Sequence, residues 1–167
     1  MDLSAVKYFI TIMSGLILIV MMTGCAADEE GVLMKRVLLN DDQASVTAVS
    51  CTGQPNNYTL QVTIASPDTG CDQYADWWEV LTPDSTLIYR RILTHSHVDE
   101  QPFTRSGGIV NVSADEFIYV RAHMNNLSYG SVVFSGTIKD SLRTDTLDPG
   151  YALSLELTAP LPSGCAF

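Results

Sequence analysis

The chain has 167 residues, 46% of them hydrophobic, and a formal net charge of −10. This length fits one domain with a hydrophobic core of ordinary size. An acidic surface is repelled by nucleic-acid phosphates and by anionic lipid headgroups, so the composition argues against both as partners. The identity of any protein or small-molecule partner is left open by the composition.

The first 24 residues have the pattern of a signal peptide. Lys7 precedes an apolar run from Tyr8 to Met22, and the small residues Thr23 and Gly24 follow it. A basic start, an apolar middle and small residues at the end are the order of a secretory leader. A membrane-spanning helix is the alternative, because the run approaches the roughly 20 apolar residues that cross a bilayer.

The end of this run favours cleavage. Met22-Thr23-Gly24-Cys25 resembles the lipobox of bacterial lipoproteins. The resemblance implies that the leader is removed before Cys25 and that this residue carries acyl chains such as palmitate, which attach the protein to a membrane without a transmembrane helix. Ala26 follows, where Asp would imply retention in the inner membrane of many Gram-negative bacteria, so the resemblance implies the outer membrane.

The expected organisation therefore has three parts. Residues 1–24 form the signal peptide, and residues 25–35 form the lipidated cysteine and its tether. The tether is short, acidic and without a hydrophobic period. Residues 36–167 form the domain, which export places in an oxidising compartment of the cell envelope.

Alternation of apolar and polar residues, the period of a half-buried β-strand, dominates this domain. It is clearest from Tyr58 to Ala65, between two turns rich in Pro, Asn, Asp and Gly. Shorter versions of the pattern predict further strands at Val37–Leu39, Ser45–Cys51, Trp77–Leu81, Thr86–Leu93, Ile109–Val112, Phe117–Met124, Ser131–Ile138 and Tyr151–Leu157. Pro83-Asp84-Ser85 predicts a hairpin between two of these strands. The pattern indicates an all-β, antiparallel β-sandwich of the immunoglobulin-like type.

One strand predicts a polar outer face. Alternation places Ile118, Val120, Ala122 and Met124 in the core, so Arg121 and His123 point the other way. Together with His95, His97 and the acidic residues Asp72, Asp76 and Glu79, they form the expected functional face. Paired arginine and carboxylate side chains explain this face, and an anion site is the alternative.

The three histidines suggest a metal site. His95 and His97 are two residues apart, so on a strand they share one side, and His123 from another strand could complete a set of three nitrogens. Zinc or copper suits such ligands. The opposing interpretation pairs these rings with acids or solvent. Asp68, Asp72, Asp76 and Glu79 likewise raise a calcium hypothesis, without the spacing of an EF-hand loop.

No catalytic motif is present in the sequence. It lacks a GxSxG elbow, an HExxH helix, a P-loop and a dinucleotide fingerprint. Aromatic residues around Trp77 and Trp78 could form a stacking platform for sugars or peptides, or pack in the core. We therefore expect a binding or structural module of the envelope, with a metal-binding and hydrolytic protein built on the three histidines as the alternative.

Three stretches carry a resemblance to known proteins: Ser66–Glu79 (SPDTGCDQYADWWE), His95–Phe103 (HSHVDEQPF) and Val120–Met124 (VRAHM). They resemble a group of small exported bacterial lipoproteins without an assigned activity. The resemblance supplies neither a substrate nor a catalytic residue.

Three cysteines remain after Cys25, so one disulfide and one free thiol are expected. Their spacing alone leaves the pairing open. In the group that the chain resembles, Cys71 belongs to the shared motif, whereas Cys51 and Cys165 do not. The resemblance therefore implies a Cys51–Cys165 disulfide and a free Cys71.

Overall fold

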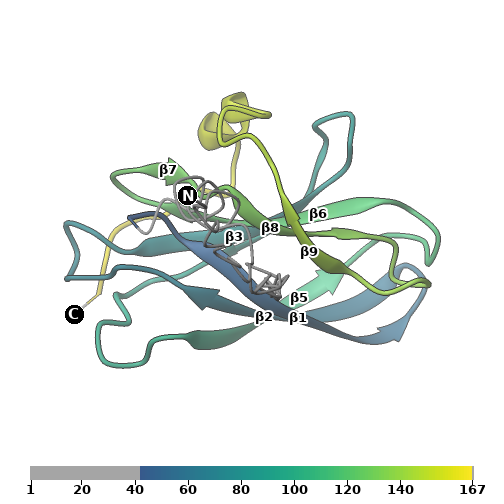
Figure 1. Cartoon of the computed structure of the whole chain (residues 1–167), viewed down its shortest axis with the longest axis horizontal. Helices are drawn as coiled ribbons and strands as arrows, with labels where there is room; N and C mark the ends of the chain where they lie inside the picture. The colour runs from purple at the N-terminus through teal and green to yellow at the C-terminus, as the bar shows by residue number, and fades with distance from the viewer. Residues whose placement is uncertain (1–41, 167) are drawn as a thin grey trace, which may run out of the picture.

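The structure is a computed structural model that describes residues 42–166, and these residues form two antiparallel β-sheets (Figure 1). The smaller sheet has the strand order β1-β2-β5, with β1 at Ser45–Gln54, β2 at Asn57–Ala65 and β5 at Phe103–Val110. The larger sheet has the order β4-β3-β6-β8-β9, with β4 at Leu87–Ile92, β3 at Ala75–Leu81, β6 at Ile118–Met124, β8 at Val132–Gly136 and β9 at Arg143–Thr146. The short strand β7, Ser128–Tyr129, pairs with β6. The predicted all-β architecture is confirmed.

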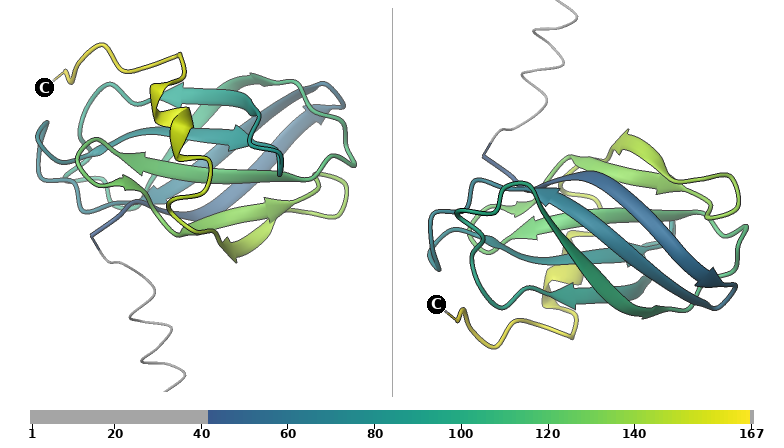
Figure 2. Two further views of the ribbon diagram at one scale, coloured as in Figure 1. Left: turned by 90° about the horizontal axis from the view of Figure 1, so that it is seen from above. Right: turned by 90° about the horizontal axis from the view of Figure 1, so that it is seen from below.

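The two sheets pack face to face around one hydrophobic core (Figure 2). The smaller sheet contributes alternate residues of β2, and the larger sheet contributes Trp78 and Val80 from β3. On β6 the core residues are Ile118, Val120, Ala122 and Met124, as alternation predicts. The period-two pattern therefore identified the inner face of this strand correctly.

Strand β3 is buried on both faces. All seven of its residues are buried, including the charged Glu79. Its hairpin partner β4 pairs Glu79 with Arg90, and its other neighbour β6 pairs Glu79 with Arg121. The predicted hairpin is confirmed, and the register places Glu79 beside Arg121.

A carboxyl-terminal segment explains why the outer face of β3 is covered. After β9 the chain returns across the larger sheet, where the 3₁₀-helix η1, Leu153–Leu157, lies over the outer face (Figure 2). We call residues 151–162 the strap. The predicted strand at Tyr151–Leu157 is wrong, because the carbonyls of this segment accept hydrogen bonds from arginine side chains instead of from a neighbouring strand.

Other element predictions differ in extent. The strand expected at Ile109–Val112 is the end of the longer β5, and β7 and β9 were not predicted. The candidate strand Val37–Leu39, like the signal peptide and tether, lies outside the described residues. Within the described range, no helix has the length and hydropathy needed to cross a bilayer.

Two adjacent glycines of β5 give a matched test of the packing between the sheets. A Cβ on Gly107 would lie 2.7 Å from Trp78 Cη2 and 2.9 Å from Tyr89 Cε1, whereas one on Gly108 would find its nearest atom at 3.5 Å. We expect Gly107→Ala to lower the free energy of unfolding by about 1–3 kcal/mol through overpacking. Gly108→Ala should change it by less than about 0.5 kcal/mol. Urea unfolding of both variants measures the difference, and equal effects would contradict this packing.

Candidate functional site

The outer face of the larger sheet carries a buried charge cluster centred on Glu79. The Glu79 side chain is fully buried, and its two carboxylate oxygens accept from different arginines. Arg90 Nε donates to Oε2 at 2.8 Å, and Arg121 Nε donates to Oε1 at 2.8 Å. The three charged residues lie on adjacent strands, and the register places Glu79 on β3 between Arg90 on β4 and Arg121 on β6. The predicted pairing of arginine with carboxylate on this face is confirmed.

The same two arginines hold the strap. Arg90 donates from Nη2 to Leu155 O at 2.8 Å and from Nη1 to Thr158 O at 2.6 Å. Arg121 donates from Nη1 to Tyr151 O at 2.5 Å and from Nη2 to the carbonyl of the next residue at 3.3 Å. Each guanidinium therefore uses one edge for the carboxylate and the other for main-chain carbonyls. The fork geometry of arginine suits this double role, which lysine could not fill.

Aromatic rings complete the surroundings of the two guanidinium groups. The Arg90 guanidinium carbon lies 4.5 Å from the centre of the Trp77 ring, and that of Arg121 lies 3.4 Å from the centre of the Tyr129 ring. Such contacts stabilise a desolvated cation by about 2 kcal/mol. Burial raises the pKa of the Tyr129 hydroxyl well above its ordinary value, and the negative charge of Glu79 acts in the same direction. Tyr129 therefore stays neutral beside the cluster.

His123 forms a second link between sheet and strap. Its Nδ1 lies 2.6 Å from Asp76 Oδ1, and its Nε2 lies 3.1 Å from Glu156 Oε1 on η1. The ring stacks on Trp77 with 3.6 Å between centres. Burial raises the pKa of the Asp76 carboxyl, and the hydrogen bond with His123 offsets part of that rise. Ser128 also donates to Glu156, so this carboxylate joins β7 to the strap as well.

An open groove of about 720 Å³ lies beside His123, between the β6–β7 hairpin and the strap. Its polar lining includes Asp76, His123 and Glu156, and its apolar lining includes Leu127, Leu157 and Leu161. No lysine or arginine lines it. This groove combines carboxylates with exposed leucines, and it is the candidate binding surface of the described residues.

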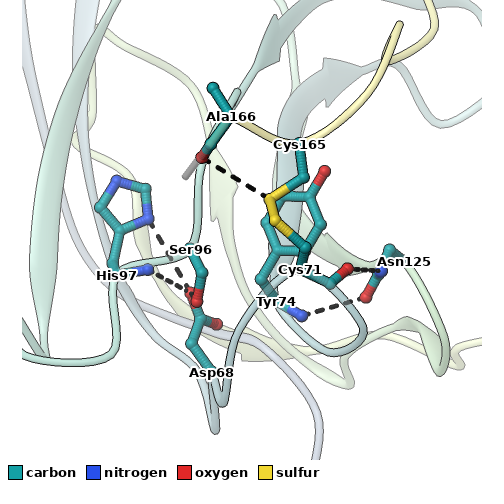
Figure 3. Close-up of a disulfide and its surroundings, with 8 residues drawn as sticks. All are labelled: Asp68, Cys71, Tyr74, Ser96, His97, Asn125, Cys165 and Ala166. Carbon is teal, nitrogen blue, oxygen red and sulfur yellow. Dashed lines mark hydrogen bonds and ion pairs between the residues drawn. A yellow bond between two sulfur atoms is a disulfide. The ribbon is translucent and has the colours of Figure 1, made fainter.

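A different acid organises the loop of the other two histidines. Asp68 is buried, and its Oδ2 accepts from the backbone N–H of His97 at 2.8 Å, while its Oδ1 accepts from the N–H of Ala75 at 3.0 Å (Figure 3). The His97 ring stacks on Phe103 with 3.7 Å between centres. Neither of its ring nitrogens has a hydrogen-bond partner within residues 42–166. Asp68 thus acts as a structural link between three segments.

The structure does not bring the three histidines together, so the predicted three-nitrogen site is wrong. His95 and His97 are neighbours, with 4.5 Å between ring centres, but His95 is exposed and His97 is buried. His123 is held in the separate pairing with Asp76 and Glu156. Across the described part of the chain, no group of three or more His, Cys, Asp or Glu residues could hold a metal ion.

The acids proposed for calcium are also dispersed. Asp68 binds the histidine loop, Asp76 binds His123, and Glu79 binds the arginines. Asp72 is exposed in the turn before β3 and takes no part in the charge cluster. Of the expected functional face, the structure brings together Asp76, Glu79, Arg121 and His123. The stacking platform is not present either, because His123 and Arg90 occupy the ring of Trp77.

The disulfide pairs Cys71 with Cys165, and Cys51 is the free cysteine of the described residues (Figure 3). The expected Cys51–Cys165 pairing is therefore wrong. Cys51 lies on β1 of the smaller sheet, whereas the chain after the strap brings Cys165 to the turn before β3, where Cys71 is located. Asn125 Nδ2 donates to Cys71 O at 2.9 Å, and Ala166 donates to Thr94 O at 2.6 Å, so both sides of the disulfide are fixed.

Comparison with known proteins gives one informative similarity. Over 85 residues, 51% of this chain, the sequence is 38% identical to a protein named "Putative lipoprotein" from Halomicrobium mukohataei. The chain spans only 41% of that protein's length. No protein-family profile and no solved structure matches the chain.

Three important residues were missed at the sequence level. Tyr129 and Glu156 contact the arginines or His123, and Asp68 supports the histidine loop. Glu156 stood in a segment predicted as a strand, and Tyr129 stood between two predicted strands. Asp68 was considered only as a calcium ligand. Each acts through a partner far away in the sequence, so no local pattern marks it.

The charge cluster predicts a large penalty for losing its anion. We expect Glu79→Ala to lower the free energy of unfolding by about 3–5 kcal/mol, because it leaves two buried arginines without a counter-charge. The matched control is Glu100→Ala, which removes an exposed partner of Arg105. That change should cost at most about 1 kcal/mol. Chemical unfolding of the oxidised protein measures both, and a small effect at Glu79 would contradict the assigned role.

His97 predicts a pH dependence of stability. Burial, with the nearby positive charges of Arg105 and His95, lowers the pKa of His97 from 6.5 to about 4. As the pH falls below 6.5, His97 takes up a proton in the unfolded chain but stays neutral in the folded protein. The free energy of unfolding therefore decreases. His97→Phe should reduce the loss of stability between pH 7 and pH 5.5, measured by urea midpoints. The exposed control His95→Gln should retain that loss, and equal slopes in both variants would contradict the prediction.

Proposed function

We propose that this protein is a lipid-anchored protein of the cell envelope. In this proposal, residues 1–24 are a signal peptide, Cys25 carries the acyl chains, and residues 26–35 tether the β domain. The similarity to a protein named as a lipoprotein supports the anchor. Ala26 after the lipidated cysteine favours the outer membrane. The domain then serves as a binding or structural module outside the cytoplasm.

The structural observation that carries the proposal is the Cys71–Cys165 disulfide. Disulfides persist in exported proteins and are rare in the cytosol, where thiols are kept reduced. The cross-link fixes the chain after the strap to the turn before β3, which supports folding in an oxidising compartment. A leader ending in Met22-Thr23-Gly24-Cys25 supplies the route to that compartment.

The proposed module is an immunoglobulin-like sandwich. The strand orders β1-β2-β5 and β4-β3-β6-β8 support this assignment, because the third strand pairs with the sixth across the sheet and the second with the fifth. A buried Trp78 on the third strand is also typical of such domains. Domains of this kind present loops and grooves on a rigid scaffold, which suits a binding or structural role.

The polar outer face supports a structural use of most of its charged residues. Glu79, Arg90 and Arg121 bond to one another and to the strap, and all three are buried. Groups committed in this way are unavailable to a soluble substrate. Recognition is therefore assigned to the open groove beside His123 and Glu156.

The lipid anchor is tested by replacing Cys25. Because acyl chains are attached through the thiol of this residue, Cys25→Ser should abolish incorporation of labelled palmitate. The control Cys51→Ser should retain both the label and the membrane attachment. Mass spectrometry of the amino-terminal peptide identifies the modification directly. An original chain that takes up no label and keeps its leader would instead make the apolar run the anchor.

A further inference from the structure

The groove beside the strap is lined by three exposed leucines. Leu157 is 86% exposed, Leu161 47% and Leu127 38%, and all three line the groove. Contiguous exposed apolar residues rimmed by polar ones mark interaction sites. Glu156 adds a negative charge at the same place; its Oε1 contacts His123 and Ser128, and no lysine or arginine lines the groove. The groove therefore suits a partner that is both apolar and basic.

The first described residues lie beside Leu127, which is one residue of the groove lining. Gln43 Nε2 donates to the carbonyl of Leu127 at 2.9 Å, and the carbonyl of Ala44 lies directly against Gly130. Figure 2 shows the first described residues at the same end of the domain as the β6–β7 hairpin and the carboxyl terminus. Gln43 therefore joins the start of the described chain to one wall of the groove.

The segment that immediately precedes the described residues has the complementary composition. Val32–Leu39 reads VLMKRVLL, with six apolar residues, two bases and no acid. Such a segment is unusual in a chain with 9 basic and 19 acidic residues. Fully extended, the six residues from Val37 to Asp42 span about 20 Å, so Arg36 lies no farther than that from Asp42.

We propose that the groove binds the basic apolar segment Val32–Leu39 of the same chain. Its apolar side chains cover Leu127, Leu157 and Leu161, and Lys35 or Arg36 pairs with Glu156. The short connection makes the docking intramolecular, with an effective concentration on the order of millimolar. A docked segment also brings the domain close to residue 25, although the docking itself does not depend on the lipid.

Trypsin cleavage after Lys35 and Arg36 tests the docking in the whole oxidised chain in mild detergent. A docked segment is cut only when it opens, so its cleavage rate reports the open fraction. Leu157→Ser should raise this rate about tenfold, since about 1.4 kcal/mol of contact energy corresponds to a factor of ten. The matched control is Leu153→Ser, because Leu153 is 46% exposed on the same helix but does not line the groove. Its cleavage rate should be unchanged.

A second variant and a second measurement keep the test independent of one substitution. Leu161→Ser should act in the same direction, and hydrogen exchange of residues 32–39 should accelerate in both groove variants. The ratio of rates should persist in Cys25→Ser, so failure of the lipid anchor leaves the docking testable. Equal cleavage rates in the original chain and both groove variants would overturn the proposal.

Other occupants of the groove give distinct results. If protection of Val32–Leu39 is lost on dilution together with dissociation of a dimer, the occupant is a second copy and the proposal fails. If protection exists only when the lipidated chain is bound to phosphatidylcholine vesicles, the occupant is the membrane surface and the proposal also fails. Protection that is independent of both concentration and vesicles supports it.

Discussion

One carboxylate, that of Glu79, determines how the carboxyl-terminal strap is held on the larger sheet. A fully buried anion is unfavourable unless it is paired, and two arginines on the neighbouring strands pair with it. Those guanidinium groups have remaining N–H donors, which in turn need acceptors in the same dry environment. The main-chain carbonyls of the strap supply them. The burial of Glu79 on β3 and the path of residues 151–162 across the sheet therefore depend on the same set of hydrogen bonds.

Local chemistry made much of the sheet structure predictable. The alternation in Tyr58–Ala65 and in Phe117–Met124 assigned the inner faces of β2 and β6 correctly, because a strand exposes successive side chains on opposite sides. Turn residues at Pro83-Asp84-Ser85 located the β3–β4 hairpin. The pairing of Glu79 with Arg121 could be anticipated, since both lie on the outward-facing positions of adjacent strands.

The errors concern contacts between residues distant in sequence. Alternating leucines between Tyr151 and Leu157 look like a strand, but arginines from β4 and β6 hold this segment as a 3₁₀-helix. The cysteine pairing depends on where the strap ends, which the spacing of cysteines does not encode. The predicted histidine metal site is wrong because two of the rings have other partners. His97 stacks on Phe103, and His123 contacts Asp76.

The position of the disulfide divides the domain mechanically. The covalent ring from Cys71 to Cys165 spans 94 residues and encloses β3 to β9, while β1 and β2 lie outside it. A pull exerted through the amino-terminal end can therefore unravel only the first two strands before it meets a loop that cannot be lengthened. Such a force would first peel β1 from β2, and the part of the domain inside the covalent ring would stay closed.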